Sequence, residues 1–157
     1  MKKYNIQNYV RYKNDVEKCI KNIPKREWVD YTRNELVVLF LPLVENLARK
    51  FATSQQASGC MSILDLFQEG GYGLTKAVDR LDRVTLSESE DQEKTLKSFL
   101  SKRIKGAIRR GIDINRGNMR IPEHKLNEIR RSFGKDQKMV AMFFNSIFLS
   151  IDDKPKD

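Results

Sequence analysis

Apolar residues recur along most of the chain at intervals of three and four positions, which is the period of an α-helix that buries one face. No stretch alternates Val, Ile or Thr with polar residues as a half-buried strand does, and the chain has only four prolines. The pattern therefore predicts an all-α protein, folded as a compact helical bundle with a short C-terminal helical extension.

The same periodicity, interrupted at turn-forming residues, predicts six helices. They are expected at residues 4–21, 32–51, 63–82, 94–112, 121–133 and 136–149. The acidic, Ser-rich segment 83–93 is expected to be a solvated loop. We expect three parts, namely an N-terminal helix within residues 1–31, a central domain over 32–120 and a C-terminal arm over 121–157.

Individual residues indicate where helices begin and where they bend. Thr32 with Glu35 three positions later predicts a capping box, and Ser62 before Asp65 predicts a second helix cap. Pro42 lies within the second helix, where it predicts either a kink or a break into two segments.

Three glycines, Gly70, Gly71 and Gly73, fall inside the third predicted helix. Glycine in a helix interior costs about 0.5–1 kcal/mol relative to alanine. The cluster therefore predicts close contact with a neighbouring helix or a local bend.

Positive charge is concentrated in one part of the chain. Basic residues outnumber acidic ones by 30 to 21, for a net charge of +9. Most of this excess lies between Lys94 and Arg120, where nine basic residues accompany a single acid, Asp113. Such a concentration favours a polyanionic partner without identifying it.

Several function classes are disfavoured by the residue types present. Two separate cysteines and one histidine give neither metal-ligand spacing nor a disulfide framework, so no cofactor is expected. No carboxylate cluster or nucleophile pair accompanies the basic segment, which argues against an enzyme such as a nuclease. The longest apolar run, 36–44, is too short to span a bilayer, and we expect a cytoplasmic protein without a membrane partner.

On a helical wheel, segment 94–112 separates into an apolar arc and a basic arc. Phe99 lies in the basic arc, away from its apolar neighbours. Single-stranded nucleic acid binds to aromatic rings set between cations, because bases stack on the ring while phosphates pair with Lys and Arg. Two other interpretations remain, a solvated basic face and a Phe99 packed under a loop. The apolar arc consists of Leu96, Leu100, Ile104, Ala107, Ile108 and Ile112, and the basic arc of Lys102, Arg103, Lys105, Arg109 and Arg110.

Two motifs resemble a known family. One is Asp65-Leu66-x-Gln68-Glu69-Gly70-x-x-Gly73-Leu74, and the other is Arg120-Ile121-Pro122-x-His124. Together with segments 41–51 and 104–108, they resemble region 2 and the start of region 3 of the sigma-70 family of RNA polymerase sigma factors. The resemblance covers about residues 32–130.

This resemblance implies a transcription initiation factor that binds the core of bacterial RNA polymerase. In the family, the Asp-Leu-x-Gln-Glu-Gly helix binds the clamp helices of the beta-prime subunit. The spacing of three and four residues also places Asp65, Gln68 and Glu69 on one helix face, where their acceptor groups suit Arg donors. The implied core-binding residues are Asp65, Gln68, Glu69, Gly71 and Thr75.

The resemblance also implies that the next helix recognises and melts the minus-ten element of promoter DNA. Phe99 falls on the aromatic that takes up the flipped adenine of the non-template strand. Lys102 and Arg103 stand where primary sigma factors have paired tryptophans, and Gly106 and Arg109 replace duplex-reading residues, so a consensus minus-ten preference is not expected. The implied DNA-binding residues are Phe99, Lys102, Arg103, Lys105, Gly106, Arg109, Arg110, Arg120, His124 and Asn127.

The C-terminal arm is too short for the helix-turn-helix that reads the minus-thirty-five element, and in this the chain resembles phage sigma factors of late transcription. A second feature of the arm is a motif with the spacing of sliding-clamp-binding peptides, formed by Gln137, Val140, Phe143 and Phe144. This motif predicts docking on a sliding clamp or the polymerase flap. The other interpretation is an apolar stripe packed in the core. The alternative function is a free-standing basic regulator that binds DNA or RNA without polymerase.

Overall fold

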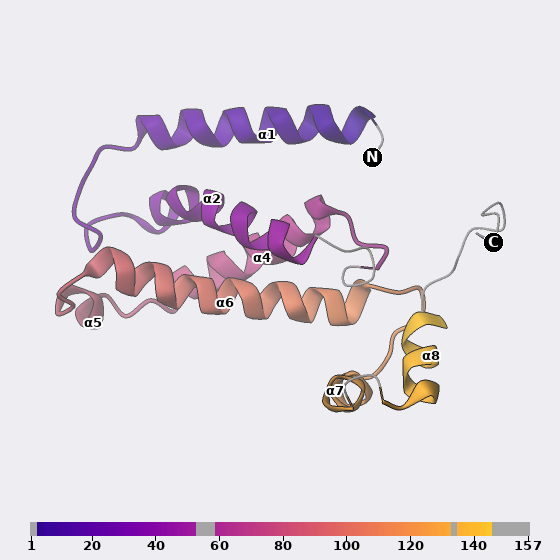
Figure 1. Ribbon diagram of the computed structural model, residues 1–157. Helices are drawn as coiled ribbons and strands as arrows, with labels where there is room; N and C mark the ends of the chain where they lie inside the picture. Colours follow the sequence, from indigo (N-terminus) through magenta and orange to yellow (C-terminus); the bar gives the residue numbers. More distant parts are fainter. Residues whose placement is uncertain (1–2, 53–58, 133–134, 146–157) are drawn as a thin grey trace.

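The computed structural model describes residues 3–52, 59–132 and 135–145, and every regular element in them is an α-helix (Figure 1). The prediction of an all-α bundle is thereby confirmed. The helices are α1 (Lys3–Asn22), α2 (Arg33–Phe51), α4 (Ile63–Asp79), α5 (Arg83–Ser87), α6 (Gln92–Asn115), α7 (Glu123–Arg131) and α8 (Gln137–Asn145). None of these described helices is long and apolar enough to cross a membrane.

The centre of the fold is formed by α2, α4 and α6, and α4 makes the most extensive contact with α6. α1 runs alongside this group, and α7 and α8 lie together beyond the end of α6 (Figure 1). The apolar arc predicted for α6 forms the core, since Leu96, Leu100, Ile104 and Ile108 are fully buried. Burial of four such side chains on one helix stabilises the bundle far more than helix propensity does.

Both predicted helix caps are present. The Thr32 hydroxyl accepts the Glu35 N–H at 3.3 Å, and the Glu35 carboxylate accepts the Thr32 N–H at 2.8 Å. Ser62 and Asp65 form the same reciprocal pair at the start of α4. These local bonds satisfy N–H groups that the first turn of a helix leaves unpaired.

Pro42 was predicted to cause either a kink or a break, and the break does not occur, because α2 continues without interruption through it. One prediction about element bounds is wrong. Segment 83–93 is not wholly a loop, because α5 occupies Arg83–Ser87 and α6 already begins at Gln92. α5 is held by the buried Leu86 and by an Asp82 cap on the Val84 N–H. The predicted helix end at residue 149 lies outside the described residues.

The glycines of α4 have different environments. A Cβ on Gly70 would lie 2.6 Å from Cγ1 of Val44, and one on Gly73 would lie 2.4 Å from Cβ of Ala107. Close helix contact is therefore the reason for both. A Cβ on Gly71 would meet nothing within 4 Å, so Gly71 borders open space.

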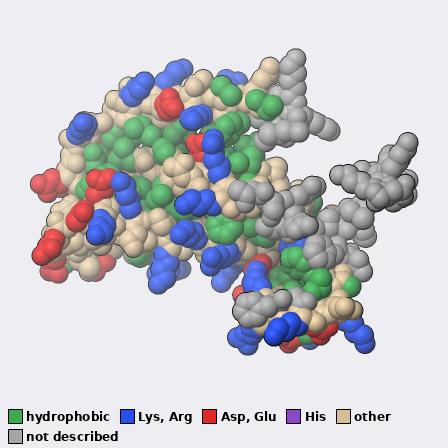
Figure 2. All heavy atoms as spheres, in the orientation of Figure 1, with side chains coloured by type: hydrophobic (Ala, Val, Ile, Leu, Met, Phe, Trp, Pro, Cys, Tyr) green, Lys and Arg blue, Asp and Glu red, His purple; other side chains and the backbone are tan. Residues whose placement is uncertain are grey.

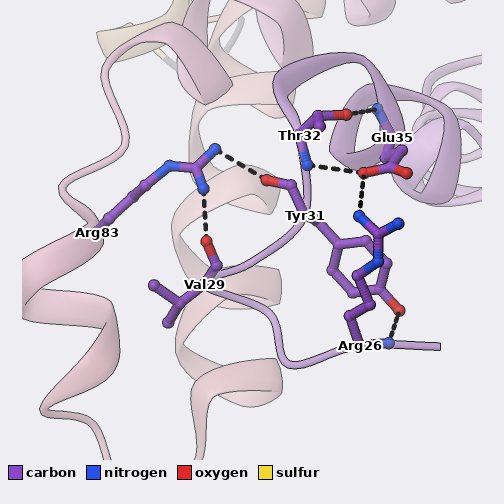
Figure 3. A network of polar contacts seen from close by, with 6 residues as sticks. All are labelled: Arg26, Val29, Tyr31, Thr32, Glu35 and Arg83. Atoms are coloured by element: carbon purple, nitrogen blue, oxygen red, sulfur yellow. Dashed lines mark hydrogen bonds and ion pairs between the residues drawn. The ribbon is translucent and has the colours of Figure 1, made fainter. Parts of the chain in front are cut away.

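A polar network ties the segment before α2 to the first residue of α5 (Figure 3). The Arg83 guanidinium donates to the carbonyl oxygens of Val29 and Tyr31, the latter at 2.9 Å. The Arg26 N–H donates to the hydroxyl of the buried Tyr31 at 3.0 Å. Two carbonyls outside any helix thus receive a charged donor, and the network joins the turn before α2 to the start of α5.

Candidate nucleic-acid interface

The basic face of α6 is exposed along its length. Figure 2 shows Lys and Arg side chains over α6, while Asp and Glu side chains collect at the end of the molecule that holds α5. The two arcs predicted for segment 94–112 therefore correspond to a buried apolar face and an exposed cationic face of α6. The exposed cations include the whole of the predicted basic arc, Lys102, Arg103, Lys105, Arg109 and Arg110.

A groove of about 770 Å³ runs between α4 and α6. It exists because Gly73 lets the two helices approach closely, so that long side chains on both helices form its walls. Among the described residues that line it, five are cations and only Glu69 is acidic, which gives it a strongly positive potential. The cations are Lys76 from α4, Arg80 at its C-cap, and Lys102, Arg103 and Arg110 from α6.

Phe99 lines this groove but is not as isolated from the core as the wheel indicated. It is half-buried and packs against the hydrophobic core, while the Arg103 guanidinium lies 5.4 Å from its ring centroid. A ring fixed by packing on one side and accompanied by a cation is a rigid platform for a base.

The core-binding candidates on α4 do not all point the same way. Asp65 and Gln68 are exposed, and the Asp65 Oδ2 accepts the Ser62 N–H at 2.7 Å and its hydroxyl at 2.8 Å. Glu69 instead lies across α6, where a Cβ on Gly111 would be 2.5 Å from its Cγ. The Glu69 carboxylate therefore faces the groove and does not lie with the exposed side chains of Asp65 and Gln68.

The other two core-binding candidates lie further along α4. The Thr75 hydroxyl donates to the Gly71 carbonyl at 3.0 Å, and Thr75 is half-buried. Open space above Gly71 leaves the backbone of α4 accessible to a partner helix at this point.

The candidates after α6 form a second basic area. Arg109 and Arg110 of α6 share a hollow of about 450 Å³ with Arg120, and His124 and Asn127 are exposed on α7. The position of α7 is set by the buried side chains of Ile121 and Leu126 and by an ion pair between Arg130 and Asp113.

The predicted docking motif on α8 is partly engaged within the molecule. Phe143 is half-buried, and the Arg116 guanidinium lies 3.2 Å from its ring centroid. Arg116 is only 4% exposed, and this burial lowers the pKa of its guanidinium. Gln137 is exposed and Val140 half-buried, while the side chain of Phe144 lies outside the described residues.

Sequence reasoning missed Tyr72, Lys76 and Arg80, which lie on the α4 wall of the groove. The four-residue spacing of these three positions places them on one helix face, which is a signal that the sequence does contain. Which neighbour that face would meet depends on how α4 packs, and periodicity does not indicate it.

The fold and the groove define a class, an all-helical protein with a cationic groove suited to a polyanionic strand. The chain is 31% identical over 121 residues to the RNA polymerase sigma factor RpoD of Helicobacter pylori, in each of two strains. The aligned region covers 75% of this chain but only 16% of each relative, so the chain spans a small part of their length. No family model matches the chain. Over this limited stretch the chain is similar to RNA polymerase sigma factors.

Proposed function

We propose that the chain acts as a transcription initiation factor of the sigma type, which binds the RNA polymerase core and opens promoter DNA at a minus-ten element. The observation that carries the proposal is the direct packing of α4 on α6, the two helices whose motifs resemble the core-binding and melting segments of sigma region 2. The similarity to two sigma factors over three quarters of the chain supports it further.

Core binding is assigned to the exposed part of α4. Asp65 and Gln68 offer oxygen acceptors to Arg or Lys donors of the beta-prime clamp helices. Both capping bonds of Asp65 end on Oδ2, so a partner can bond Oδ1 without disturbing the cap. Gly71 and Thr75 extend this surface by one turn, whereas Glu69 contributes by positioning the α4–α6 pair.

DNA opening is assigned to the groove and the basic face of α6. Extruding a base costs a few kcal/mol. Stacking on Phe99 returns about 1–3 kcal/mol per base, and the surrounding cations supply the phosphate contacts that offset the rest. Gly106 has no side chain with which to read a base, so we expect weak sequence preference at the edge of the duplex.

The first experiment tests core binding by pull-down with bacterial core polymerase. A triple variant carrying Asp65→Asn, Gln68→Ala and Glu69→Gln is expected to bind weakly. A control that neutralises the same number of acids, two exposed ones at the far end, Glu88→Gln with Glu90→Gln, is expected to bind as the original chain does. A chain that binds promoter DNA but never binds core would instead be a free-standing regulator.

The second experiment tests DNA opening by the permanganate reactivity of unpaired thymines in promoter complexes. Phe99→Ala is expected to reduce opening more than duplex binding, and Phe99→Tyr is expected to retain both. Because Phe99 also packs against the core, the unfolding midpoint of each variant is measured alongside. Equal loss of opening and duplex binding would assign Phe99 a purely structural role.

We also propose that α8 docks on a sliding clamp or on the polymerase flap. In this structure Phe143 lies against Arg116, so docking through Phe143 requires that contact to open. A sliding-clamp pull-down is expected to lose binding on Gln137→Ala, an exposed position whose change leaves the Arg116 contact in place. Unchanged clamp and flap binding in that variant would identify α8 as structural.

A further inference from the structure

Tyr72 is the most exposed aromatic residue of the described chain, with 59% of its surface accessible. Two other large apolar residues of α4, Leu66 and Leu74, are fully buried in the core. Tyr72 therefore has no packing role that explains its ring. A single exposed ring is common on protein surfaces, so exposure alone does not indicate a function. The position of Tyr72 in the groove is more informative.

The ring lies on the α4 wall of the cationic groove, and Phe99 lies on the α6 wall. Both rings have a cation beside them. The Lys76 ammonium is 4.3 Å from the Tyr72 centroid, and the Arg103 guanidinium is 5.4 Å from the Phe99 centroid. The groove thus repeats, on its second wall, the pairing of ring and cation that single-stranded nucleic acid binds.

The two rings are separated along the groove. Gly73, next to Tyr72, contacts Ala107 of α6. Ala107 is eight residues from Phe99, which corresponds to about 12 Å along a helix at 1.5 Å per residue. Stacked nucleotides rise about 3.4 Å each along a strand. The rings are therefore spaced for two bases of one strand that lie a few nucleotides apart.

We propose that Tyr72 is a second base-stacking residue, which takes an unpaired base of the same DNA strand whose flipped base stacks on Phe99. This inference rests on the proposed function and adds a subsite to it. Lys76 covers one face of the ring, and the exposed remainder of the ring receives the base. Because every base has a π-face, Tyr72 contributes affinity without sequence preference.

The test measures binding of a fluorescently labelled 12-nucleotide single strand to the whole chain by anisotropy, without polymerase. Tyr72→Ala is expected to weaken binding by about 5- to 150-fold, the loss that corresponds to removal of one stacked base. Tyr72→Phe and Tyr72→Trp are expected to bind nearly as tightly as the original chain. Val84→Ala, an exposed apolar truncation outside the groove, is the control for nonspecific effects.

Salt dependence separates stacking from charge. Tyr72→Ala is expected to leave the slope of log K against log salt unchanged, because the ring carries no charge, whereas Lys76→Met is expected to reduce it by about 0.7. A blunt duplex of the same sequence is expected to bind equally well to Tyr72→Ala and to the original chain.

The inference is overturned if the original chain does not bind the single strand, if Tyr72→Ala binds it unchanged, or if duplex binding falls equally. Since polymerase is absent, these outcomes are independent of core binding. Failure to bind core would refute the sigma proposal alone. An ineffective Tyr72→Ala in a chain that does bind core would refute the second subsite alone.

Discussion

Replacement of Gly73 by alanine tests the helix contact on which the groove depends. The new Cβ would lie 2.4 Å from Cβ of Ala107 and 3.4 Å from the Arg103 carbonyl oxygen. Two carbons at the first of these distances overlap severely. Ala107 cannot rotate its Cβ away, so α4 and α6 must separate.

The expected loss follows from two opposing effects. Overpacking of a tight contact costs about 1–3 kcal/mol, and exchanging glycine for alanine in a helix returns about 0.5–1 kcal/mol. Subtracting the middle of one range from the middle of the other leaves a net loss in the free energy of unfolding of about 1.25 kcal/mol, within a range of about 0–2.5 kcal/mol. With a urea m value of about 2 kcal/mol/M, the unfolding midpoint measured by circular dichroism is expected to fall by about 0.6 M.

Two other glycines provide matched controls, because a Cβ on Gly71 or on Gly106 would meet nothing within 4 Å. Gly71→Ala and Gly106→Ala are expected to raise the midpoint by about 0.25–0.5 M, since they gain helix propensity without a clash. Adding Ala107→Gly to Gly73→Ala is expected to cost less than the sum of the two single changes. A Gly73→Ala variant as stable as Gly71→Ala would refute the close approach of the helices.

Three further predictions concern the network, pH and salt. Arg83→Met removes both bonds to the Val29 and Tyr31 carbonyls and is expected to lower stability by about 1–3 kcal/mol in urea unfolding, with Arg83→Lys intermediate. Hydrogen bonds from the Thr32 backbone and hydroxyl lower the pKa of Glu35 below its ordinary 4.5. The ionised Glu35 carboxylate therefore stabilises the fold above pH 4.5, and this contribution is lost as pH falls through the lowered pKa. Glu35→Gln is therefore expected to show a shallower loss of midpoint below pH 4.5, and an equally steep loss would contradict this. Five groove cations predict a salt slope of about −3.5 for single-stranded DNA, and a slope near zero would show that they do not contact phosphates.

Features that depend on local sequence were predicted well. The buried arc of α6 follows from the helical period alone, and the two capping boxes need only residues three positions apart. Local sequence left open whether the second helix is kinked or broken at Pro42. Pro42 removes a backbone hydrogen bond, but α2 buries Phe40 before it and Val44 after it, and this tertiary packing outweighs the local cost.

Features that depend on the packing of one helix against another were not predicted. α5 is only five residues long, and the network around Arg83 that holds it joins segments more than fifty residues apart. The burial of Arg116 depends on α8, and the presence of Tyr72 in the groove depends on α4 meeting α6 at Gly73. The sequence pattern therefore indicated the basic wall of the groove but not the opposite one.

The basic residues of segment 94–120 consequently have different roles. Lys97 forms an ion pair with Glu93, and Arg116 is buried beside Phe143, so both charges serve the fold. Lys76 and Arg80 lie outside that segment, yet they line the groove. The surface proposed to bind a polyanion is thus assembled from two helices. Because the contact between these helices sets the spacing of the cations and of both rings, we expect any change that separates α4 from α6 to weaken the proposed DNA binding even when every charged residue is retained.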